Sequence, residues 1–253
     1  DNDKNILLAA GGTGGHLYGA ESLASELSLE GYNTFLFTDK RVGKLVKGFV
    51  QDNVKEIFSD TFTNKSFYKW PFVVFKILLG FISSLILIKK INPKAVVGFG
   101  GYPTIPVILA AKLYGSKIII HEQNIILGRA NKLLVKLADI ITLGFDNTIG
   151  VPKNYRKKTF FSGNPIRRDI LKYQSPYKAF SEKDKFNLVI FGGSQGASFF
   201  SKTIPPSLCM LSDKKKSFLK VFHQVRPEEV ESVKNFYSSK NINAEVSNFF
   251  DNL

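Results

Sequence analysis

The sequence is poor in the residues that build metal and disulfide sites. Its 253 residues include one cysteine and three histidines. The single cysteine, Cys209, excludes an internal disulfide framework and a cysteine-based metal cluster, and it fits a reducing compartment. The histidines His16, His121 and His223 have no metal-ligand spacing, and the one Asp-x-Asp pattern lies ahead of any predicted strand. We therefore predict no metal and no cofactor.

Acidic residues are scarce, and one long stretch has none. No aspartate or glutamate lies between Asp60 and Glu122, although lysines recur through that stretch, and the chain carries a formal net charge of +14. Nucleic-acid-binding surfaces combine basic with aromatic residues, whereas the basic residues here frame an aliphatic block, Ile77–Ile88. The pattern favours an anionic membrane surface, contacted through the region Lys65–Lys94, and no nucleic acid.

The most apolar stretch allows several interpretations. Residues 70–88 approach the length of about 20 residues that is needed to cross a bilayer. They contain Pro71 and Lys76, however, and they lead through Asn92-Pro93 into a predicted strand, which speaks against a transmembrane span. A crossover helix packed on a sheet and a helix on a membrane surface both stay open, and both can hold on different faces of one helix.

Apolar runs alternate with helical patterns along the chain. The predicted strands are 5–10, 33–38, 54–58, 95–99, 117–121, 140–143, 186–191, 220–223 and 244–246. The predicted helices are 17–29, 77–88, 105–113, 133–138 and 228–237, with one more directly after the glycine turn at 192–197. This alternation predicts an α/β fold with a doubly wound, mainly parallel sheet.

The strand and helix pattern restarts after a polar, basic linker at 173–185. We therefore predict two Rossmann-like domains, residues 1–163 and 164–253. The second domain holds about half the elements of the first, and a sheet with so few strands leaves an edge unpaired. We expect the sequence to end within its second domain.

Glycine-rich turns follow the first strand of each predicted domain: Gly11-Gly12-Thr13-Gly14-Gly15-His16 and Gly192-Gly193-Ser194-Gln195-Gly196-Ala197. A strand, a glycine turn and a helix together place backbone N–H groups and a helix N-terminus against an anionic ligand. The first turn matches neither the Walker pattern nor the dinucleotide fingerprint, whose third glycine would be Leu17. An ordinary tight turn between strand and helix is the alternative.

Three further motifs lie between these two turns, and two of them follow predicted strands at the edge where parallel sheets bind ligands. They are Gly98-Phe99-Gly100-Gly101-Tyr102-Pro103, His121-Glu122-Gln123-Asn124 and Gly163-Asn164-Pro165-Ile166-Arg167. In this order and at this spacing, the five motifs resemble those of the GT-B glycosyltransferases of family 28, which act in peptidoglycan synthesis. The resemblance covers essentially the whole chain.

This resemblance implies a GT-B fold, in which two Rossmann-like domains face a cleft. It implies inverting, metal-independent transfer of N-acetylglucosamine from UDP-N-acetylglucosamine to the 4-hydroxyl of the muramoyl sugar of lipid I, which forms lipid II. It also implies a peripheral protein at the cytoplasmic face of the bacterial inner membrane. Its partners would be UDP-N-acetylglucosamine, lipid I and anionic lipid.

The resemblance also assigns site residues. His16 is the candidate general base, since an ordinary histidine pKa of ~6.5 suits that role; a bond to phosphate or a helix cap is the alternative. The nucleotide sugar is expected at Thr13, Gly14, Gly15, Asn124, Arg167, Ser194 and Phe250. The acceptor pyrophosphate is expected at Gly100, Gly101 and Tyr102. For Ser194 and Asn124, ordinary loop capping is the alternative.

Departures from the family pattern leave other functions open. Leu17-Tyr18-Gly19-Ala20 lacks the usual proline before alanine, and no donor-reading glutamate or glutamine follows Phe249-Phe250-Asp251. We therefore expect the chain not to be competent alone. One alternative is a diacylglycerol-type glycosyltransferase. Another is an NAD(P)-dependent oxidoreductase, with Asp39 as the ribose-binding acid. A third is a non-catalytic nucleotide- or lipid-binding protein.

Overall fold

The computed structural model describes residues 4–11, 14–40, 49–61, 66–176, 185–192 and 198–250. The chain forms two compact units, Asp1–Gln174 and Ser175–Leu253. The first unit extends past residue 163, the predicted end of the first domain. It does so because the next segment contacts α1 (Gly14–Leu29): Arg168 forms an ion pair with Glu26.

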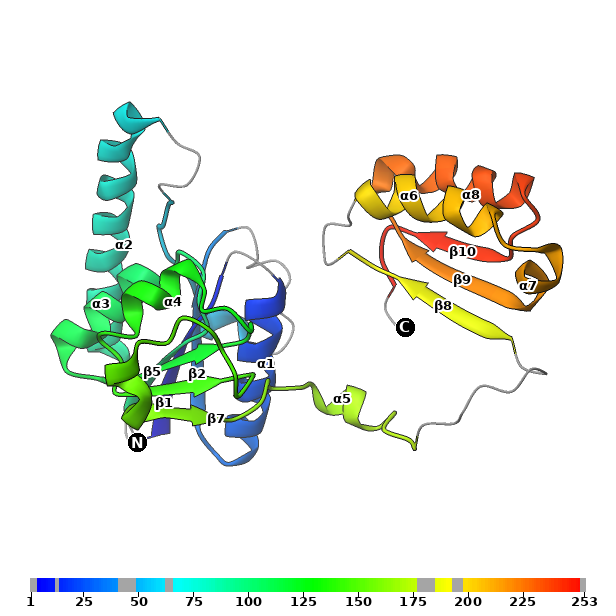
Figure 1. Cartoon of the computed structure of the whole chain (residues 1–253). Coiled ribbons are helices and arrows are strands. Elements are labelled where there is room, and N and C mark those ends of the chain that lie inside the picture. Colours follow the sequence, from blue (N-terminus) through cyan, green and yellow to red (C-terminus); the bar gives the residue numbers. More distant parts are fainter. Residues whose placement is uncertain are drawn as a thin grey trace. The chain divides into compact units, whose positions relative to one another are not determined.

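The first unit is built on a sheet of seven strands (Figure 1). They are β1 (Asn5–Ala9), β2 (Asn33–Thr38), β3 (Val54–Glu56), β4 (Ala95–Gly98), β5 (Lys117–Glu122), β6 (Ile140–Leu143) and β7 (Thr159–Phe161). Their order is β3-β2-β1-β4-β5-β6-β7, and every neighbouring pair is parallel. The strand order reverses between β1 and β4, the switch point where doubly wound sheets bind ligands. The predicted fold class is confirmed.

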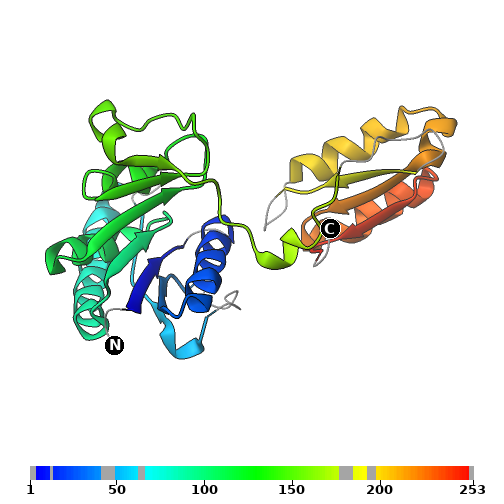
Figure 2. The same ribbon diagram turned by 90° about the horizontal axis from the view of Figure 1, so that it is seen from below.

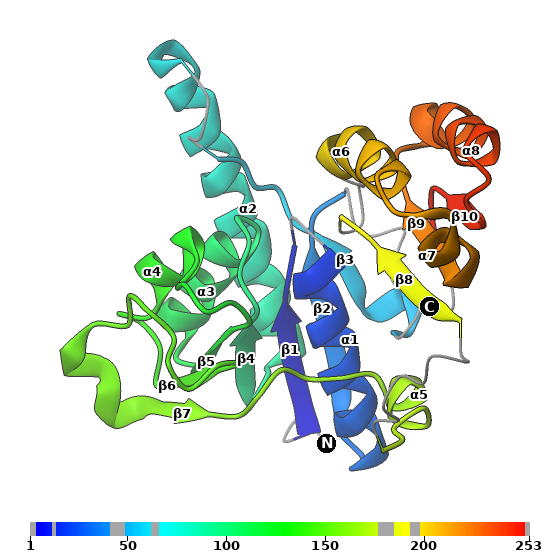
Figure 3. The ribbon, with the colours of Figure 1, turned by 45° about the vertical axis from the view of Figure 1, so that its right-hand side comes forward.

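Helices cover both faces of this sheet. α1 lies on one face, whereas α2 (Trp70–Ile91), α3 (Thr104–Tyr114) and α4 (Arg129–Leu134) lie on the other (Figures 2 and 3). Alternation along β1 explains the two layers: Ile6 and Leu8 belong to the core cluster of α1, while Leu7 and Ala9 belong to that of α2, α3 and α4. The short helix α5 (Arg168–Leu171) follows the last strand.

Helix α2 is much longer than the strands that it connects. Its 22 residues extend about 33 Å, and its first half projects beyond the rest of the unit (Figure 1). The helix packs along one narrow stripe, in which Val73, Gly80, Ser84 and Ile88 are buried. A Cβ on Gly80 would lie 1.9 Å from the carbonyl oxygen of Phe58, so only glycine permits this approach. α2 is thus a crossover helix, with most of its surface exposed.

The segment Phe67–Ile91, which adds the short turn η4 (Phe67–Lys69) to α2, is long and apolar enough to cross a membrane. Its mean hydropathy is 2.4, and 22% of the most apolar window is buried inside the protein. Among the described residues it is the one candidate of this kind. The helix is capped at its end by Asn92, which adopts the left-handed conformation, and the chain then continues into β4. The second half of the helix is therefore held against the sheet.

Within its described residues, the second unit has three parallel strands in the order β10-β9-β8. Its elements are β8 (Phe186–Ile190), α6 (Ser198–Cys209), α7 (Asp213–Phe218), β9 (Leu219–Gln224), α8 (Val230–Ser239) and β10 (Ala244–Ser247). Because successive strands are added in one direction, right-handed crossovers place α6 and α8 on the same face, as Figure 1 shows. The core between these helices and the sheet includes Val221 of β9 and Val233 and Tyr237 of α8.

Several element predictions need correction. α1 begins at Gly14, inside the predicted glycine turn, and α4 occupies 129–134 rather than 133–138. The short elements β7, α5 and α7 were not predicted. β7 has three residues and α5 four, which is too short to produce a periodic pattern.

Candidate functional site

The carboxyl ends of β1 and β4 bring two of the predicted glycine turns into contact. Gly100 and Gly101 have φ values of +97° and +82°. A Cβ on Gly101 would lie 2.2 Å from the carbonyl oxygen of Gly11, so glycine is required here for both conformation and space. Thr104 Oγ1 donates a hydrogen bond of 2.7 Å to the Gly100 carbonyl and holds the turn. The two turns therefore form one wall at the switch point.

His16 lies in the first turn of α1, beside Gly100. Its Nε2 atom is 3.3 Å from the position that a Cβ on Gly100 would take. Burial lowers the pKa of His16, while the Glu122 carboxylate and a hydrogen bond with the Gly11 backbone oppose that shift. The imidazole is therefore neutral at neutral pH, which is the form that accepts a proton. Gly14 and Gly15, predicted as loop residues, precede it as the first helical residues.

Glu122 organises the turn that follows β5. Its side chain is 1% exposed. Its Oε1 atom accepts hydrogen bonds from the backbone N–H and the side-chain Nδ2 of Asn124, each at 2.9 Å. Its Oε2 atom accepts from the Gly128 N–H at 2.8 Å and from Asn131 Nδ2 at 2.9 Å. Four such bonds offset the cost of burying a carboxylate.

Sequence reasoning missed Glu122 and Asn131 as site residues. Glu122 belongs to the motif His121-Glu122-Gln123-Asn124, but the family resemblance assigns it no role. The available signal was an acidic residue at the end of a buried parallel strand. A buried carboxylate is costly unless it accepts hydrogen bonds, so such a residue predicts a local hydrogen-bond network. Asn131 gave no signal in the sequence, because it lies ten residues after His121 and outside the motif. The contact is formed only in the fold, where Asn131 Nδ2 donates a hydrogen bond to the His121 carbonyl.

His121 is part of the scaffold beneath the turn. It is 3% exposed, and its Nδ1 atom lies 3.0 Å from Thr142 Oγ1. Its ring meets Phe99 edge to face, with centroids 5.5 Å apart. Burial lowers the pKa of His121, against the opposing influence of Asn164 and Glu122. These contacts connect β4, β5 and β6 just below the site.

Arg167 and Tyr102 complete the predicted residues of the first unit. The guanidinium of Arg167 lies over the ring of Tyr18, 5.3 Å from its centroid, and therefore beside the first turns of α1. Arg167 itself is exposed. Tyr102 is half-buried next to the Gly100-Gly101 turn, and its carbonyl accepts a hydrogen bond from the Ile105 N–H. The first unit thus gathers Gly14, Gly15 and His16, Gly100 to Tyr102, Asn124, and Arg167 at its carboxyl edge or beside α1.

Phe250 follows β10 at the carboxyl edge of the second sheet. Its ring packs edge to face on Phe222, with centroids 6.4 Å apart. Ser247 Oγ donates to the Phe249 carbonyl at 2.7 Å, which helps to hold the segment. Thr13 and Ser194, two other predicted contacts of the nucleotide sugar, lie outside the described residues, as does Lys65 of the predicted membrane-contacting region.

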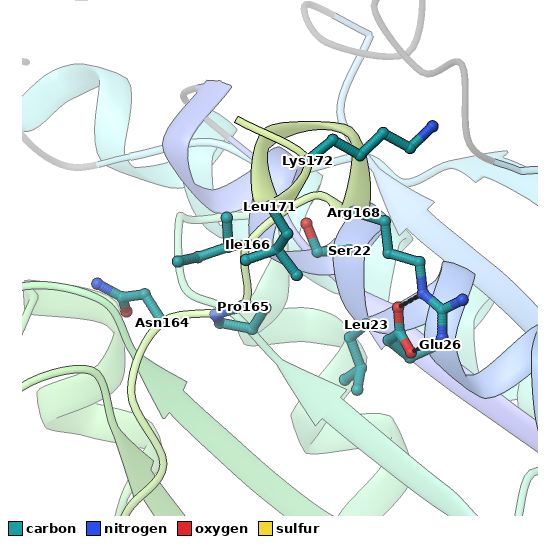
Figure 4. A pocket seen from close by; sticks show the side chains of 9 residues that line it. All are labelled: Ser22, Leu23, Glu26, Asn164, Pro165, Ile166, Arg168, Leu171 and Lys172. Atoms are coloured by element: carbon teal, nitrogen blue, oxygen red, sulfur yellow. Dashed lines mark hydrogen bonds and ion pairs between the residues drawn. The ribbon is translucent and has the colours of Figure 1, made fainter. Parts of the chain in front are cut away.

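A groove of about 770 Å³ lies between α1 and the segment that contains α5. Figure 4 shows its lining, in which Arg168 faces Glu26; Arg168 Nη2 donates to Glu26 Oε2 at 2.7 Å. The other lining residues are Ser22, Leu23, Asn164, Pro165, Ile166, Leu171 and Lys172. None of the predicted site residues lines it, so we assign no ligand to this groove. Among the described residues, no three His, Cys, Asp or Glu side chains could hold a metal ion together.

Comparison with family models now places the chain. Residues 6–142 match the glycosyltransferase family 28 N-terminal domain, and residues 187–253 match the family 28 C-terminal domain. The chain belongs to glycosyltransferase family 28. The motif resemblance is therefore confirmed at the level of the family.

Named relatives in family 28 cover nearly all of the chain. One, from Rhizobium meliloti, is 44% identical over 99% of this chain and 67% of its own length. Another, from Bartonella bacilliformis, is 41% identical over 100% of this chain and 66% of its own. Both are named UDP-N-acetylglucosamine–N-acetylmuramyl-(pentapeptide) pyrophosphoryl-undecaprenol N-acetylglucosamine transferase. The chain therefore spans about two thirds of the length of these relatives.

Solved structures agree with the GT-B architecture. The crystal structure of MurG from Acinetobacter baumannii matches with a TM-score of 0.68 and 27% identity, over 98% of this chain and 67% of that one. A putative UDP-N-acetylglucosamine 2-epimerase from Listeria monocytogenes matches with a TM-score of 0.60 and 12% identity, over 97% and 69%. At that identity the second likeness is one of fold alone.

Proposed function

We propose that this family 28 chain serves the transfer of N-acetylglucosamine from UDP-N-acetylglucosamine to the 4-hydroxyl of the muramoyl sugar of lipid I, which forms lipid II. The observation that carries the proposal is the neutral His16 beside the Gly100-Gly101 turn at the switch point of the sheet. The names of the relatives from Rhizobium meliloti and Bartonella bacilliformis support both the sugar nucleotide and the lipid-linked acceptor.

In this proposal His16 is the general base. As the 4-hydroxyl oxygen forms a bond to the anomeric carbon, the imidazole takes the hydroxyl proton, and the bond from that carbon to the UDP oxygen breaks with inversion. Gly14 and Gly15 expose first-turn N–H groups of α1, which favour the negative charge that develops on the diphosphate. Residues of the chain thus supply both the base and part of the charge stabilisation.

The remaining residues divide between the two substrates. Asn124 is proposed to contact the sugar of the nucleotide donor together with Thr13, Gly14 and Gly15. Arg167 and Ser194 are proposed to contact its phosphates, and Phe250 its uracil. The turn Gly100-Gly101-Tyr102 is proposed to hold the acceptor pyrophosphate, because backbone N–H groups in a glycine turn, which no Cβ shields, can line a concavity that binds an anion.

We also propose that the chain binds the surface of an anionic membrane through α2. This helix runs from the carboxyl edge of the sheet back to its amino edge, so its projecting first half lies on the side of the site turns. That half and the preceding turn η4 expose the apolar side chains of Phe67, Tyr68, Trp70, Phe72, Val74, Phe75 and Leu78. Insertion of this half would bring the site turns to the lipid that carries the acceptor. We propose the cytoplasmic face of the inner membrane as the location.

Membership of family 28 removes the oxidoreductase alternative. Asp39, its best support, is 6% exposed, and its Oδ2 atom lies 3.0 Å from the position of a Cβ on Gly11, so it packs against the glycine turn. A transferase that acts on diacylglycerol is the second candidate function, since the exposed apolar half of α2 suits either lipid acceptor.

A transfer assay tests the proposal. The chain is fused to the remaining C-terminal third of the Rhizobium meliloti relative, and radiolabelled N-acetylglucosamine transfer is measured with lipid I or diacylglycerol. We expect product from lipid I only, and loss of turnover in His16→Ala with intact binding of UDP-N-acetylglucosamine. Equal turnover by His16→Ala would refute the base assignment, and product from diacylglycerol alone would refute the acceptor.

A further inference from the structure

Asn131 presents an unused hydrogen-bond acceptor at the wall of the site. Its side chain is 2% exposed. Its Nδ2 atom donates to the His121 carbonyl at 3.1 Å and to Glu122 Oε2 at 2.9 Å. Both of these partners are acceptors, so the nitrogen must face them and the oxygen must face away. That Oδ1 atom has no hydrogen-bond partner among the residues that the structure describes.

The orphaned oxygen borders the same small space as His16. A Cβ on Gly100 would lie 3.3 Å from His16 Nε2 and 3.4 Å from both Oδ1 and Nδ2 of Asn131, and Nδ2 is already engaged with its two acceptors. The missing Cβ of Gly100 thus leaves room between an acceptor atom and the proposed base. A buried acceptor without a partner is unfavourable, so a group that donates a hydrogen bond is favoured in this space.

Glu122 orients the side-chain amide of Asn124 in the same way as that of Asn131, with the nitrogen toward the carboxylate. The carboxylate Oε1 accepts from Asn124 Nδ2, so the amide oxygen of Asn124 is the atom left for a ligand. Gln123, between these two residues, also has amide atoms that are buried and have no partner within the described ranges. The turn after β5 therefore offers carboxamide oxygens in fixed orientations, which select hydroxyl or amide N–H groups over phosphate oxygens.

We infer that Asn131 is a ligand-binding residue, whose Oδ1 atom accepts a hydrogen bond from a sugar hydroxyl located over Gly100 beside His16. Glu122 is the positioning residue that fixes this orientation. The inference rests on the proposed function, and it adds the chemistry of the group recognised: a neutral hydroxyl donor on either the nucleotide sugar or the muramoyl acceptor. A phosphate cannot satisfy this atom, because it offers acceptor oxygens only.

Binding of deoxy-sugars to the chain fused to the C-terminal third of the Rhizobium meliloti relative, as in the transfer assay, tests the inference. Affinities are measured by calorimetry for UDP-N-acetylglucosamine and its 3-, 4- and 6-deoxy analogues, and for a soluble muramoyl-pentapeptide acceptor and its 4- and 6-deoxy analogues. For one analogue, wild type should lose roughly tenfold in affinity, as for a single hydrogen bond of about 1.4 kcal/mol. Asn131→Ala should bind that analogue and its parent equally. The analogue that shows this coupling identifies which substrate supplies the hydroxyl.

Controls separate the possible failures. Asn154→Ala changes an exposed asparagine of the same unit and should retain the wild-type discrimination. If Asn131→Ala does not fold, the side-chain NH₂ resonances of Asn131 in wild type report instead, and they should shift with the parent sugar but not with the deoxy analogue. The inference is overturned, while the proposed function stands, if both substrates bind normally but Asn131→Ala changes the discrimination against none of the deoxy analogues. Asn131 resonances that do not shift with the parent sugar overturn it in the same way. Failure of wild type to bind either substrate overturns the proposed function and the inference with it.

Discussion

Glu122 and Asn124 are joined by two hydrogen bonds to one carboxylate oxygen. Oε1 accepts from both the backbone N–H and the side-chain Nδ2 of Asn124, each at 2.9 Å. This geometry orients an exposed asparagine from beneath, through a side chain that solvent does not reach. The negative charge of Glu122 also acts on His16, where it opposes the effect of burial. One buried carboxylate thus influences both the proposed sugar contact Asn124 and the proposed base His16.

Replacement of Glu122 by glutamine should therefore change two measurements. The Glu122 carboxylate raises the pKa of His16. Loss of its charge should therefore lower that pKa further, and the midpoint of the His16 titration measured by NMR should move to lower pH. Glutamine also has one acceptor oxygen, whereas both oxygens of the Glu122 carboxylate accept hydrogen bonds that orient Asn124 and Asn131. With one of these asparagines no longer held, sugar affinity should fall by about tenfold. Glu56→Gln, at an exposed position of β3, is the control. A His16 titration that does not move in Glu122→Gln would contradict the electrostatic role.

Gly80 should be intolerant of alanine. The added Cβ would lie 1.9 Å from the Phe58 carbonyl oxygen, a backbone atom that cannot move alone. We expect Gly80→Ala to lower the free energy of unfolding by about 2–3 kcal/mol, measured by urea denaturation. Val74→Ala, at a 45% exposed position of the same helix, should change it by no more than about 0.5 kcal/mol. Equal stability of the two variants would show that α2 does not pack along the stripe at Gly80.

The projecting half of α2 should determine vesicle binding. Phe72 and Phe75 are 70% and 59% exposed, and removal of two phenylalanines from lipid contact should weaken binding at least about tenfold. Phe72→Ser with Phe75→Ser is compared with Leu113→Ser, which alters a similarly exposed side chain near the other end of the sheet. Co-sedimentation with anionic vesicles should be lost in the double variant only.

The charge contribution to this binding is separable by salt. The basic residues favour anionic over neutral vesicles, and that preference should shrink as salt rises. Equal binding to neutral and anionic vesicles at low salt would mean that the apolar surface of α2 alone accounts for membrane binding. Binding that survives the double phenylalanine change would refute α2 as the contact.

His223 should make the second unit less stable in mild acid. It is fully buried, its Nδ1 atom lies 2.9 Å from the Tyr237 hydroxyl, and burial lowers the pKa of His223 from 6.5 to about 4. Between these values the unfolded chain binds the proton and the folded chain does not, so stability is full above pH 6.5 and falls toward pH 4. The loss should approach about 3 kcal/mol.

Hydrogen exchange of β9 amides at pH 7 and pH 4.5 measures this loss within the second unit. His223→Gln should flatten the dependence, because it removes the titrating group. His121→Gln, in the first unit, should leave the β9 amides unaffected. An unchanged pH dependence in His223→Gln would assign the acid sensitivity to another group.

Local pattern was sufficient for strands that are clearly bounded in the sequence. The bounds of β2 and β6 were predicted without error because each is a short apolar run between polar or glycine-containing segments. The start of α4 was predicted four residues late. There the Glu122 carboxylate accepts from the N–H of Gly128, the residue that caps the helix, so a residue of β5 decides where α4 begins.

The sequence by itself determined the α/β alternation, the glycine turn at Gly100-Gly101 and the family, and it proposed His16 as the candidate base, since all of these rest on residue type and local spacing. Only the tertiary structure decided that Gly101 packs on Gly11, that His16 and Asn131 border one space over Gly100, and that Glu122 orients two asparagines. These contacts join residues that follow different strands. They depend on the register of β1, β4 and β5 across the sheet, which no spacing along the chain specifies.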